Sequence, residues 1–443
     1  MHYKVNKMKK IKVMWIAYQP LAIIAKDMGM NVSDAFGGWL EGAAERINFH
    51  GEIELIYCFP NSVQVEGNIN NIQYYSLKPI KEIHFKDITE YKDSDFKRFK
   101  SIVEQNKPDI IQIYGTEQLF QRQYIKMAYD MGMINKTIVW IQGLVLFCAQ
   151  CYNSGFTIKQ IKSATLWEKF RRTNISGIQK RLALNGKDEV RCLKLLKNVF
   201  VRTDWDYACC KSINENLCFY KCNETLRSQF YENKIWNIEK IERHSIFISQ
   251  YSTPIKGFHI LIKALPIILK EFPDTIIYTT GKDLLSTNGM IDSVRESSYL
   301  KILRKLIVQN NLEKNVKFLG VLNAEDMRNR YIMSHVSVLS SEIENSSNSI
   351  GEAIMLGVPL VAADVGGVSS MVKDKEHCLL YPFYEYAMLA ENICKIFRSD
   401  ELANNLSESA KKRAQIIYNK EKNYNDLINS YKIINGDING SFS

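Results

Sequence analysis

Short apolar runs rich in β-branched residues recur along the chain and alternate with longer stretches whose apolar residues follow a helical spacing. The short runs predict buried strands, and the stretches between them predict helices. Strands that alternate with helices indicate parallel sheets covered on both faces. The predicted strands fall into two series, 11–17, 53–57, 109–114, 137–141 and 198–202, and then 245–249, 275–280, 316–319, 336–339, 360–363 and 378–381.

Each series is long enough for one doubly wound α/β domain, so the pattern predicts two such domains. We expect an N-terminal Rossmann-like domain at residues 1–235 and a C-terminal one at 236–420. The polar segment before residue 244 would be the seam. A single polar helical pattern covers 400–434, and residues 421–443 would form a C-terminal helix and tail that could return to the N-terminal domain.

The composition of the 443 residues, 46% hydrophobic and 24% charged, is that of a globular protein. No apolar run reaches the ~18 residues that a membrane-spanning helix needs. The apolar run that follows the basic N-terminus is interrupted by Lys12, which favours a first strand over a signal peptide. We therefore expect a cytoplasmic protein whose ten cysteines need not pair. Cys148 and Cys151 lack a second pair nearby, and we expect no metal site.

Positive charge is concentrated in two places. The net charge is +10, of which residues 1–12 contribute +5, while residues 156–200 carry eleven basic and three acidic side chains. Neither segment shows a recognised nucleic-acid-binding module, so no nucleic-acid partner is expected. The stretch around 166–172 has the amphipathic, basic character that suits an anionic membrane surface. A solvated helix face explains the same charges equally well.

Ligands of open parallel sheets bind beyond the carboxyl ends of the strands, so the loops after the predicted strands are the candidate sites. Tyr18-Gln19-Pro20 follows the first strand without the glycine fingerprint of dinucleotide binding, which disfavours a nicotinamide oxidoreductase. Gly37 and Gly38 precede a helical stretch and would let backbone N–H groups approach a diphosphate. Simple turn chemistry is the commoner reason for such a pair.

The second series carries more specific chemistry. Lys256 and Gly257 follow a strand and open a helix, where the lysine can reach into an interdomain cleft. Glu344 lies in the loop after strand 336–339, before a run of serines. Glu352 lies inside the next helix and can accept from two adjacent hydroxyls, as a ribose-binding carboxylate does. An N-capped helix with an acidic first turn fits the same pattern, and the spacing alone does not decide between them.

One stretch of the sequence resembles the E-x7-E region of family 4 retaining glycosyltransferases, which have the GT-B fold. In this stretch seven residues separate Glu344 from Glu352, and glycines follow at 357 and 366–367. The resemblance extends through segments 255–257, 316–320 and 37–40. Segments 109–117, 142–144 and 202–206 are similar to a bacterial surface-polysaccharide branch of that family. The similar segments span most of the chain in the same order.

This resemblance implies two domains facing one cleft, and the transfer of a hexosyl group from a nucleotide-diphosphate-sugar donor. The acceptor would be a glycan or lipid-linked glycan of cell-surface polysaccharide synthesis. The anomeric configuration would be retained without a metal or other cofactor, at the inner face of the plasma membrane. Carried over to this chain, the resemblance implies a catalytic set of Lys256, Glu344 and Gln142, and donor-binding residues Gly37, Gly38, Gln250, Gly257, Phe318, Asn348, Ser349 and Glu352.

Three departures from the family pattern matter. An arginine that many members carry before the Lys-Gly turn is missing, and Arg243 or Lys282 are candidates to replace it. Asn345-Ser346-Ser347 stands where Gly-Phe-Pro is usual. Gln142 stands where a histidine is frequent, which suggests a neutral partner for a sugar hydroxyl or carbonyl. Arg227, near the seam, could face the cleft or pack at the hinge. The departures keep open an alternative, a non-catalytic GT-B protein that assists another glycosyltransferase.

Overall fold

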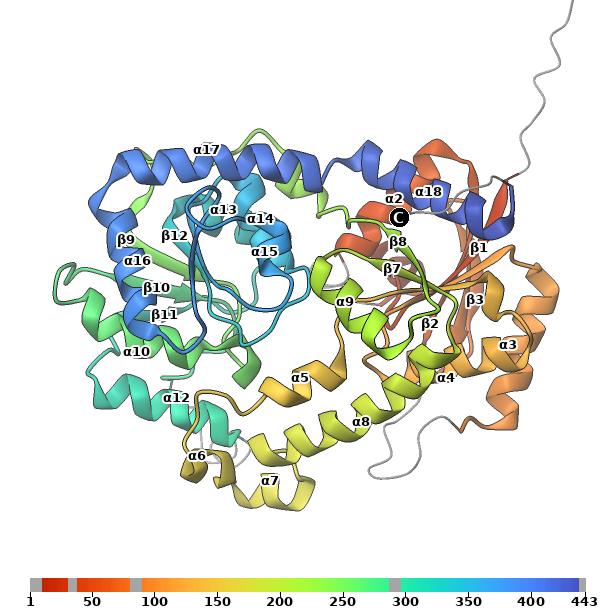
Figure 1. Cartoon of the computed structure of the whole chain (residues 1–443), viewed down its shortest axis with the longest axis horizontal. Helices are drawn as coiled ribbons and strands as arrows, with labels where there is room; N and C mark the ends of the chain where they lie inside the picture. The colour runs from red at the N-terminus through yellow and green to blue at the C-terminus, as the bar shows by residue number, and fades with distance from the viewer. Residues whose placement is uncertain (1–9, 31–37, 80–89, 287–295, 438–443) are drawn as a thin grey trace, which may run out of the picture.

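The computed structural model describes residues 10–30, 38–79, 90–286 and 296–437. These residues form two α/β domains that stand side by side, each built around one central sheet (Figure 1). Neighbouring strands are parallel in both sheets, with one exception at an edge. The predicted fold class of two parallel-sheet α/β domains is confirmed.

The N-terminal sheet has eight strands in the order β3-β4-β2-β1-β5-β6-β7-β8. Its strands are β1 Ile11–Ile16, β2 Ile53–Pro60, β3 Glu66–Ile69, β4 Ile72–Leu77, β5 Ile110–Tyr114, β6 Thr137–Trp140, β7 Asn198–Val201 and β8 Cys218–Lys221. The helices of this half are α1 Ala22–Asp27, α2 Gly38–His50, α3 Asp93–Asn106, α4 Leu119–Asp130, α5 Val145–Cys151, α6 Ile158–Lys162, α7 Leu166–Arg171, α8 Ile175–Leu195 and α9 Asp204–Ile213, with 3-10 turns at Ile134–Lys136 and Ser228–Tyr231.

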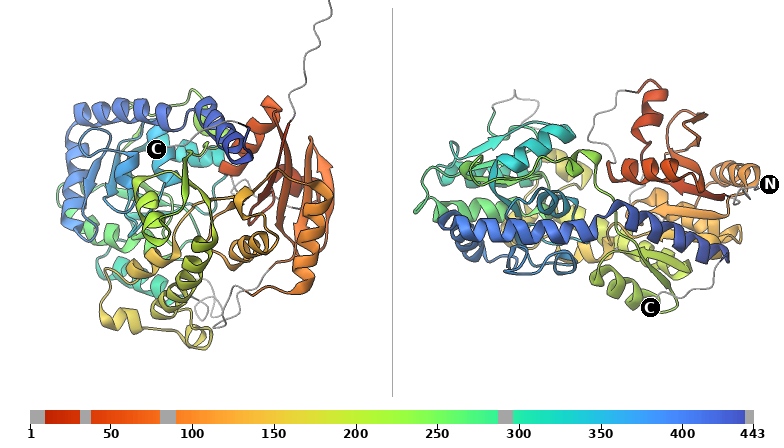
Figure 2. Two further views of the ribbon diagram at one scale, coloured as in Figure 1. Left: turned by 45° about the vertical axis from the view of Figure 1, so that its right-hand side comes forward. Right: turned by 90° about the horizontal axis from the view of Figure 1, so that it is seen from above.

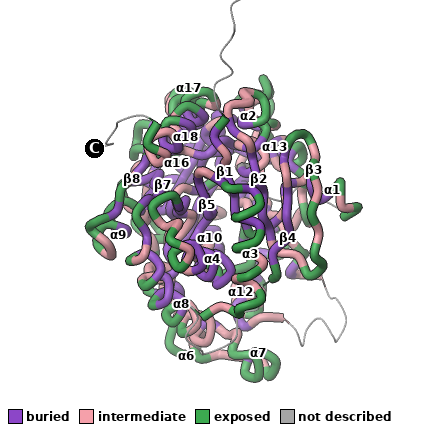
Figure 3. Tube along the Cα trace, turned by 90° about the vertical axis from the view of Figure 1, so that its right-hand side faces the viewer, coloured by how far each residue is buried: buried purple, intermediate pink, exposed green. Residues whose placement is uncertain are grey.

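Strand β1 shows why both faces of this sheet are covered by helices. Val13 and Trp15 belong to one apolar core, whereas Met14 and Ile16 belong to another, and all four are fully buried. Successive side chains of a strand point to opposite faces of the sheet, so a strand that is apolar throughout must be covered on both faces. The central strands are accordingly buried in Figure 3, and exposure is concentrated in the surrounding helices and loops.

The C-terminal sheet has six parallel strands in the order β11-β10-β9-β12-β13-β14. Its strands are β9 Glu242–Ile248, β10 Ile276–Thr279, β11 Val316–Phe318, β12 Ser334–Leu339, β13 Leu360–Ala363 and β14 Leu379–Tyr381. Its helices are α10 Phe258–Ile268, α12 Ser298–Gln309, α13 Ala324–Met333, α14 Asn348–Leu356, α15 Val368–Met371, α16 Tyr386–Arg398 and α17 Asp400–Ile417, after which α18 Lys420–Asn435 ends the described chain, and Pro254–Lys256 forms a 3-10 turn.

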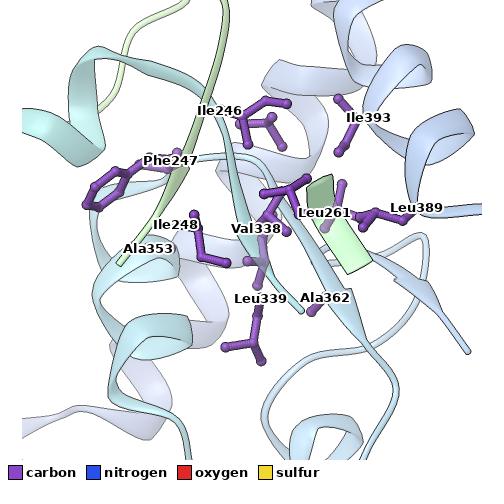
Figure 4. Packing of buried hydrophobic residues seen from close by; sticks show 14 of the residues in the cluster. Ile246, Phe247, Ile248, Leu261, Val338, Leu339, Ala353, Ala362, Leu389 and Ile393 are labelled. Carbon is purple, nitrogen blue, oxygen red and sulfur yellow. The ribbon is translucent and has the colours of Figure 1, made fainter. Parts of the chain in front are cut away.

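Aliphatic side chains from β9, β12, α10 and α16 interdigitate in the C-terminal core (Figure 4). Ile246, Val338 and Leu261 are at most 4% exposed there, beside Leu389 and Ile393 of α16. The same core takes in residues upstream of the predicted boundary at 236, such as Leu226 and Phe230. The connection after β8 therefore already packs on the C-terminal domain.

Three strands, β3, β4 and β8, lie outside the predicted strands, and one predicted helix differs. β3 and β4 form an antiparallel hairpin, turned by Asn70 and Asn71, both of which have positive φ angles. The helical pattern over 400–434 is two helices rather than one. The first helix, α17, ends at Ile417, and Tyr418 is its C-cap. The side chain of Asn419 then accepts a hydrogen bond from the backbone N–H of Lys422 and caps α18.

The break lets α18 cross from one domain to the other, which the view from above shows (Figure 2). Tyr424, Leu427, Ile428 and Tyr431 of α18 are buried in the N-terminal core, whereas α17 packs on the C-terminal domain. The Tyr431 hydroxyl accepts from Trp15 Nε1 at 3.0 Å and donates to Gln112 Oε1. The last helix therefore completes the domain with which the chain begins.

A second link between the domains is an arm made of α5, α6 and α7, of which α6 and α7 lie below α12 in Figure 1. Phe156 of the arm packs against His259 and Tyr299 of the C-terminal domain. Glu168 Oε1 on α7 accepts from the backbone N–H of Ser298 at 2.8 Å and from its hydroxyl at 3.1 Å. The arm thus caps the first turn of α12 with a buried carboxylate.

The Tyr431 hydroxyl gives a test of how α18 is anchored. Tyr431→Phe should destabilise the protein by about 1–3 kcal/mol, because it leaves a buried donor and a buried acceptor without partners. Tyr424→Phe is the control on the same helix, since its hydroxyl lies 3.5 Å from Glu52 in a partly exposed place. Thermal and urea unfolding of both variants would measure the difference. Equal stability of the two variants would show that the buried contact is not what anchors α18.

Candidate active site

A cavity of about 580 Å³ lies between the two domains, at the carboxyl ends of both sheets. The N-terminal domain lines it with residues that follow β1, β6 and β7, namely Tyr18, Gln142 and Arg202, and with Gly38 at the start of α2. The C-terminal domain lines it with the turn after β9, the loop after β12 and the first turns of α14. The position is the one that parallel sheets predict for a ligand.

Lys256 and Glu344 form an ion pair at the floor of this cavity. Lys256 Nζ lies 2.7 Å from Glu344 Oε1, and the same oxygen accepts from the hydroxyl of Ser341 at 2.7 Å. The lysine comes from the turn that opens α10 and the glutamate from the loop after β12. Both side chains are therefore supplied by the ends of adjacent strands, β9 and β12.

Gly257 explains how the lysine turn can lie so close to the loop after β12. Its φ angle is +64°, and a Cβ atom there would overlap the carbonyl oxygen of Ser340. The Ser340 hydroxyl donates to the Lys256 carbonyl at 3.1 Å, and the Glu342 N–H donates to the Ile255 carbonyl at 2.8 Å. These two hydrogen bonds fasten the lysine turn to the loop that carries Glu344.

Glu352 lies on the second turn of α14 and faces Arg227. Arg227 Nη2 is 2.6 Å from Glu352 Oε1. Burial raises the pKa of the Glu352 carboxyl, and the neighbouring guanidinium opposes that rise. The N-terminal turn of the same helix, with Ser347, Asn348 and Ser349, lines the cavity. Helix N–H groups and a carboxylate are therefore presented together, which suits a ligand with both an anionic group and hydroxyls.

Polar groups from both domains meet beside Gln142. Asn345 Nδ2 donates to Asp206 Oδ2 at 2.9 Å, and the Thr203 hydroxyl donates to Asn345 Oδ1 at 2.7 Å. Arg202 donates to the backbone carbonyls of Ile141 and Gln142, both at 3.1 Å. The Gln142 side chain lines the cavity, and its Nε2 has no hydrogen-bond partner in the described part of the chain. That amide is available to a ligand.

The structure brings most of the sequence-predicted site residues to this cavity. Lys256, Glu344, Gln142, Gly38, Gln250, Asn348, Ser349 and Glu352 line it. Two predicted residues stand behind the surface: Gly257 lies against Ser340, and the Phe318 ring packs edge-on against Tyr251 at 5.0 Å. In the segment after β11, Val321 and Leu322 line the cavity instead. Gly37 lies outside the described residues.

Neither candidate for the missing arginine lines the cavity. Arg243 forms a bidentate ion pair with Asp400 at an exposed surface, and the cavity is lined by Gly281 but not by Lys282. Tyr18, Arg202 and Asn345 are site residues that the sequence argument did not assign. The strand-end rule could have indicated Tyr18 and Arg202, since each follows a predicted strand. Among the described residues, no group of three or more His, Cys, Asp or Glu side chains has a metal-binding arrangement.

Glu342, two residues before Glu344, is a buried carboxyl outside the cavity. It is 4% exposed, and neither carboxyl oxygen has a hydrogen-bond partner among the residues that the structure describes. Burial raises the pKa of Glu342 to about 9. The group is therefore protonated and neutral at pH 7, beside the loop that carries Glu344.

Residues 230–413 match the family model described as glycosyl transferases group 1. The matched segment is less than half of the chain, and it is similar to the glycosyltransferases of group 1. It contains Lys256, Glu344 and Glu352, whereas Gly38, Gln142 and Arg227 lie before the matched residues. Spore coat protein SA of Bacillus subtilis is 24% identical over 189 residues, which are 42% of this chain and 48% of that protein. The matches span between 35% and 48% of the length of three curated relatives.

Solved structures share the arrangement of both domains. Sucrose-phosphate synthase from Thermosynechococcus elongatus has a TM-score of 0.69 at 15% identity, over 97% of this chain and all of that one. Anabaena HepE in complex with UDP-glucose has a TM-score of 0.61 at 14% identity, over 95% of this chain and 99% of that one. The two domains together have the GT-B fold.

The buried Glu342 predicts an unusual pH dependence of stability. An unfolded glutamate titrates near pH 4.3, so folding takes up a proton between that pH and about 9, and wild-type stability falls as pH rises through this window. Glu342→Gln removes the effect, worth up to about 1.4 kcal/mol per pH unit. Relative to the wild type, the variant should therefore gain thermal stability as the pH rises from 5 to 9.

Differential scanning fluorimetry across that pH range would measure the gain. Glu313→Gln, which removes an exposed carboxyl of the same domain, is the matched control. A melting-temperature difference between Glu342→Gln and the wild type that stays constant with pH would contradict the prediction.

Proposed function

We propose that this protein is a glycosyltransferase that moves a hexosyl group from a nucleotide-diphosphate-sugar to a glycan or lipid-linked glycan acceptor. One observation carries the proposal: Lys256, Glu344 and Glu352 line a single cavity between two Rossmann-like domains, beside the N-terminus of α14. HepE, which shares the fold, has been seen with UDP-glucose, and this supports a donor of the same class. The similar segments in the N-terminal half support family 4 and a role in surface-polysaccharide synthesis.

Charge explains how these residues would act. The diphosphate gains negative charge as it leaves the sugar, and Lys256 with the N–H groups of the first turn of α14 would offset that charge without a metal ion. Glu352 would accept hydrogen bonds from the ribose hydroxyls. Gln142, whose amide is unpartnered among the described residues, would contact a sugar hydroxyl.

The proposal includes retention of the anomeric configuration. Retention follows when the acceptor attacks from the face that the diphosphate leaves. Glu344 already accepts from Lys256 and Ser341 on one oxygen, which lowers its strength as a nucleophile. We therefore assign Glu344 to stabilising the positive charge of the sugar rather than to bonding with it.

Substitution of the lysine and the ribose carboxylate tests the site. Lys256→Gln should lower turnover about 100-fold or more, because it removes charge that matters in the transition state. Glu352→Gln should instead raise the donor KM roughly tenfold, because it weakens a hydrogen bond present before and during reaction. The assay is release of nucleoside diphosphate from a panel of nucleotide sugars, with Lys270→Gln on the protein surface as control.

Three outcomes separate the alternatives. Wild-type activity in both variants would rule out the site. A wild-type protein that binds no nucleotide diphosphate by calorimetry would favour the alternative of a non-catalytic GT-B partner protein. Loss of activity in Lys270→Gln as well would point to a general effect of removing a lysine.

The α6–α7 segment supports peripheral binding to an anionic bilayer, where a lipid-linked acceptor would lie. Leu166 and Phe170 of α7 are each 84% exposed, and Ile158 of α6 is 72% exposed. Basic side chains surround them, and the Arg171 guanidinium lies 4.5 Å from the Trp167 ring centre. Exposed apolar residues among cations are typical of helices that lie in a membrane interface. In the described parts of the chain, no helix is both long and apolar enough to cross a bilayer.

Vesicle flotation tests this placement. Neutralising Lys169, Arg171 and Arg172 to Gln should weaken binding to vesicles of 30% phosphatidylglycerol about 100-fold, at about 1 kcal/mol per charge. Leu166→Ser with Phe170→Ser should weaken binding at all salt concentrations. The matched control neutralises Lys187, Lys194 and Lys197, three exposed lysines on or just after α8. Equal loss in the control would show a general charge effect instead of binding through α7.

A further inference from the structure

The cavity needs more positive charge than Lys256 alone supplies if it binds a diphosphate. A bound diphosphate carries at least two negative charges, and Glu344 and Glu352 add two more. The turn that precedes Lys256 offers only the neutral Ser249 and Gln250. Three cationic side chains line the cavity within the described residues: Arg202, Arg227 and Lys256.

Arg202 is already committed to the protein. Its Nη1 lies 2.6 Å from Glu224 in a pair that is at most 3% exposed, and its Nη2 donates to two backbone carbonyls. Withdrawing the guanidinium would leave Glu224 buried without a counter-charge, which is strongly destabilising. Arg202 therefore cannot turn toward a ligand, and Arg227 is the cation that remains.

Arg227 stands where the two domains and the cavity meet. It belongs to the connection after β8, and a Cβ atom on Gly38 would overlap its Cγ and Cδ atoms, so the glycine makes room for the arginine stem. The guanidinium carbon lies 5.0 Å from the Phe230 ring centre. Glu352 is the one acceptor that the guanidinium contacts among the described residues, and the side chain is 17% exposed. Further N–H groups of the guanidinium are left for a ligand.

We propose that Arg227 is the second diphosphate-binding cation, supplied by the interdomain connection in place of the arginine that the Lys256 turn lacks. The inference rests on the proposed function of the cavity. Its guanidinium lies between Gly38 at the start of α2 and Glu352 on α14, so it can bridge the ribose carboxylate and the phosphates of one nucleotide. A planar guanidinium offers paired N–H groups that match phosphate oxygens.

This position also makes donor binding sensitive to the arrangement of the domains. Arg227 follows the last strand of the N-terminal sheet, yet it contacts a helix of the C-terminal domain. A lysine or arginine on the turn before Lys256 would move with the C-terminal domain alone. Arg227 instead brings its charge to the donor site only when the connection, Gly38 of the N-terminal domain and α14 of the C-terminal domain lie next to one another.

A competing role for Arg227 is to keep Glu352 ionised and nothing more. The two roles differ in which part of the nucleotide loses affinity. If Arg227 acts only through Glu352, its substitution affects the ribose contact, and the affinities for nucleoside monophosphate and diphosphate fall equally. If Arg227 binds the terminal phosphate, its substitution lowers the affinity for the diphosphate alone, or lowers it much more than the affinity for the monophosphate.

Isothermal titration of the full chain with matched monophosphates and diphosphates of uridine, adenosine, guanosine and thymidine decides between them. The pair that wild type binds best is then titrated into Arg227→Gln, Arg227→Lys and Lys256→Gln. The ratio of the monophosphate Kd to the diphosphate Kd should fall about tenfold or more in Arg227→Gln, and fall likewise in Lys256→Gln. Arg227→Lys should restore part of the ratio, and it also tests the residue if Arg227→Gln does not fold.

The outcomes distinguish this inference from the function on which it rests. If the ratio falls in Lys256→Gln but is unchanged in Arg227→Gln and Arg227→Lys, the inference is wrong and the proposed function stands. Equal weakening of both nucleotides in Arg227→Gln assigns Arg227 to Glu352 alone and also overturns the inference. If wild type binds no nucleotide of the panel, the proposed function fails, and the inference fails with it.

Discussion

The Arg202 guanidinium, buried at the edge between the domains, is the constraint on which the site depends. A buried charge is costly unless it is paired and hydrogen-bonded, and Arg202 is both, through Glu224 and the carbonyls at the end of β6. Asp206 lies beside it; burial raises the pKa of that carboxyl, and Arg202 opposes the rise. Asn345 of the C-terminal domain donates to Asp206. Because Asn345 directly follows Glu344, this polar cluster also helps to position Glu344 in the cavity.

The same requirement for paired charge shapes the cavity itself. Glu344 and Glu352 each face one cation, Lys256 and Arg227, at 2.7 and 2.6 Å. A ligand with phosphates and hydroxyls would replace both partners at once, since its anionic oxygens suit the cations and its hydroxyls suit the carboxylates. The protein therefore holds its own charges in balance in a pattern that complements a nucleotide sugar.

The sequence predicted the parts of this structure that follow from local rules, and missed those that depend on distant partners. Lys256, Glu344 and Glu352 could be brought together because parallel strands end at one edge of a sheet. The β3–β4 hairpin had a signal, Asn70-Asn71, that matches a two-residue turn with positive φ angles. Asn419 was likewise a helix N-cap within an apparently continuous pattern. The contact of Arg227 with Glu352, across 125 positions, has no local signature. Phe318 was placed by family likeness, and side-chain packing turned it toward Tyr251 instead.

The arm shows how the exposed face of α7 is related to the cavity. Its single buried acidic side chain, Glu168, is used to cap α12, and that contact orients α7 so that Leu166 and Phe170 point away from the protein. Phe156 fixes the preceding turn against His259, whose pKa burial lowers to about 3, so that the ring is a neutral packing partner. The arm belongs to the N-terminal domain by chain connection and to the C-terminal domain by contact. A bilayer bound through α7 would therefore lie against a segment that contacts both of the domains that line the cavity.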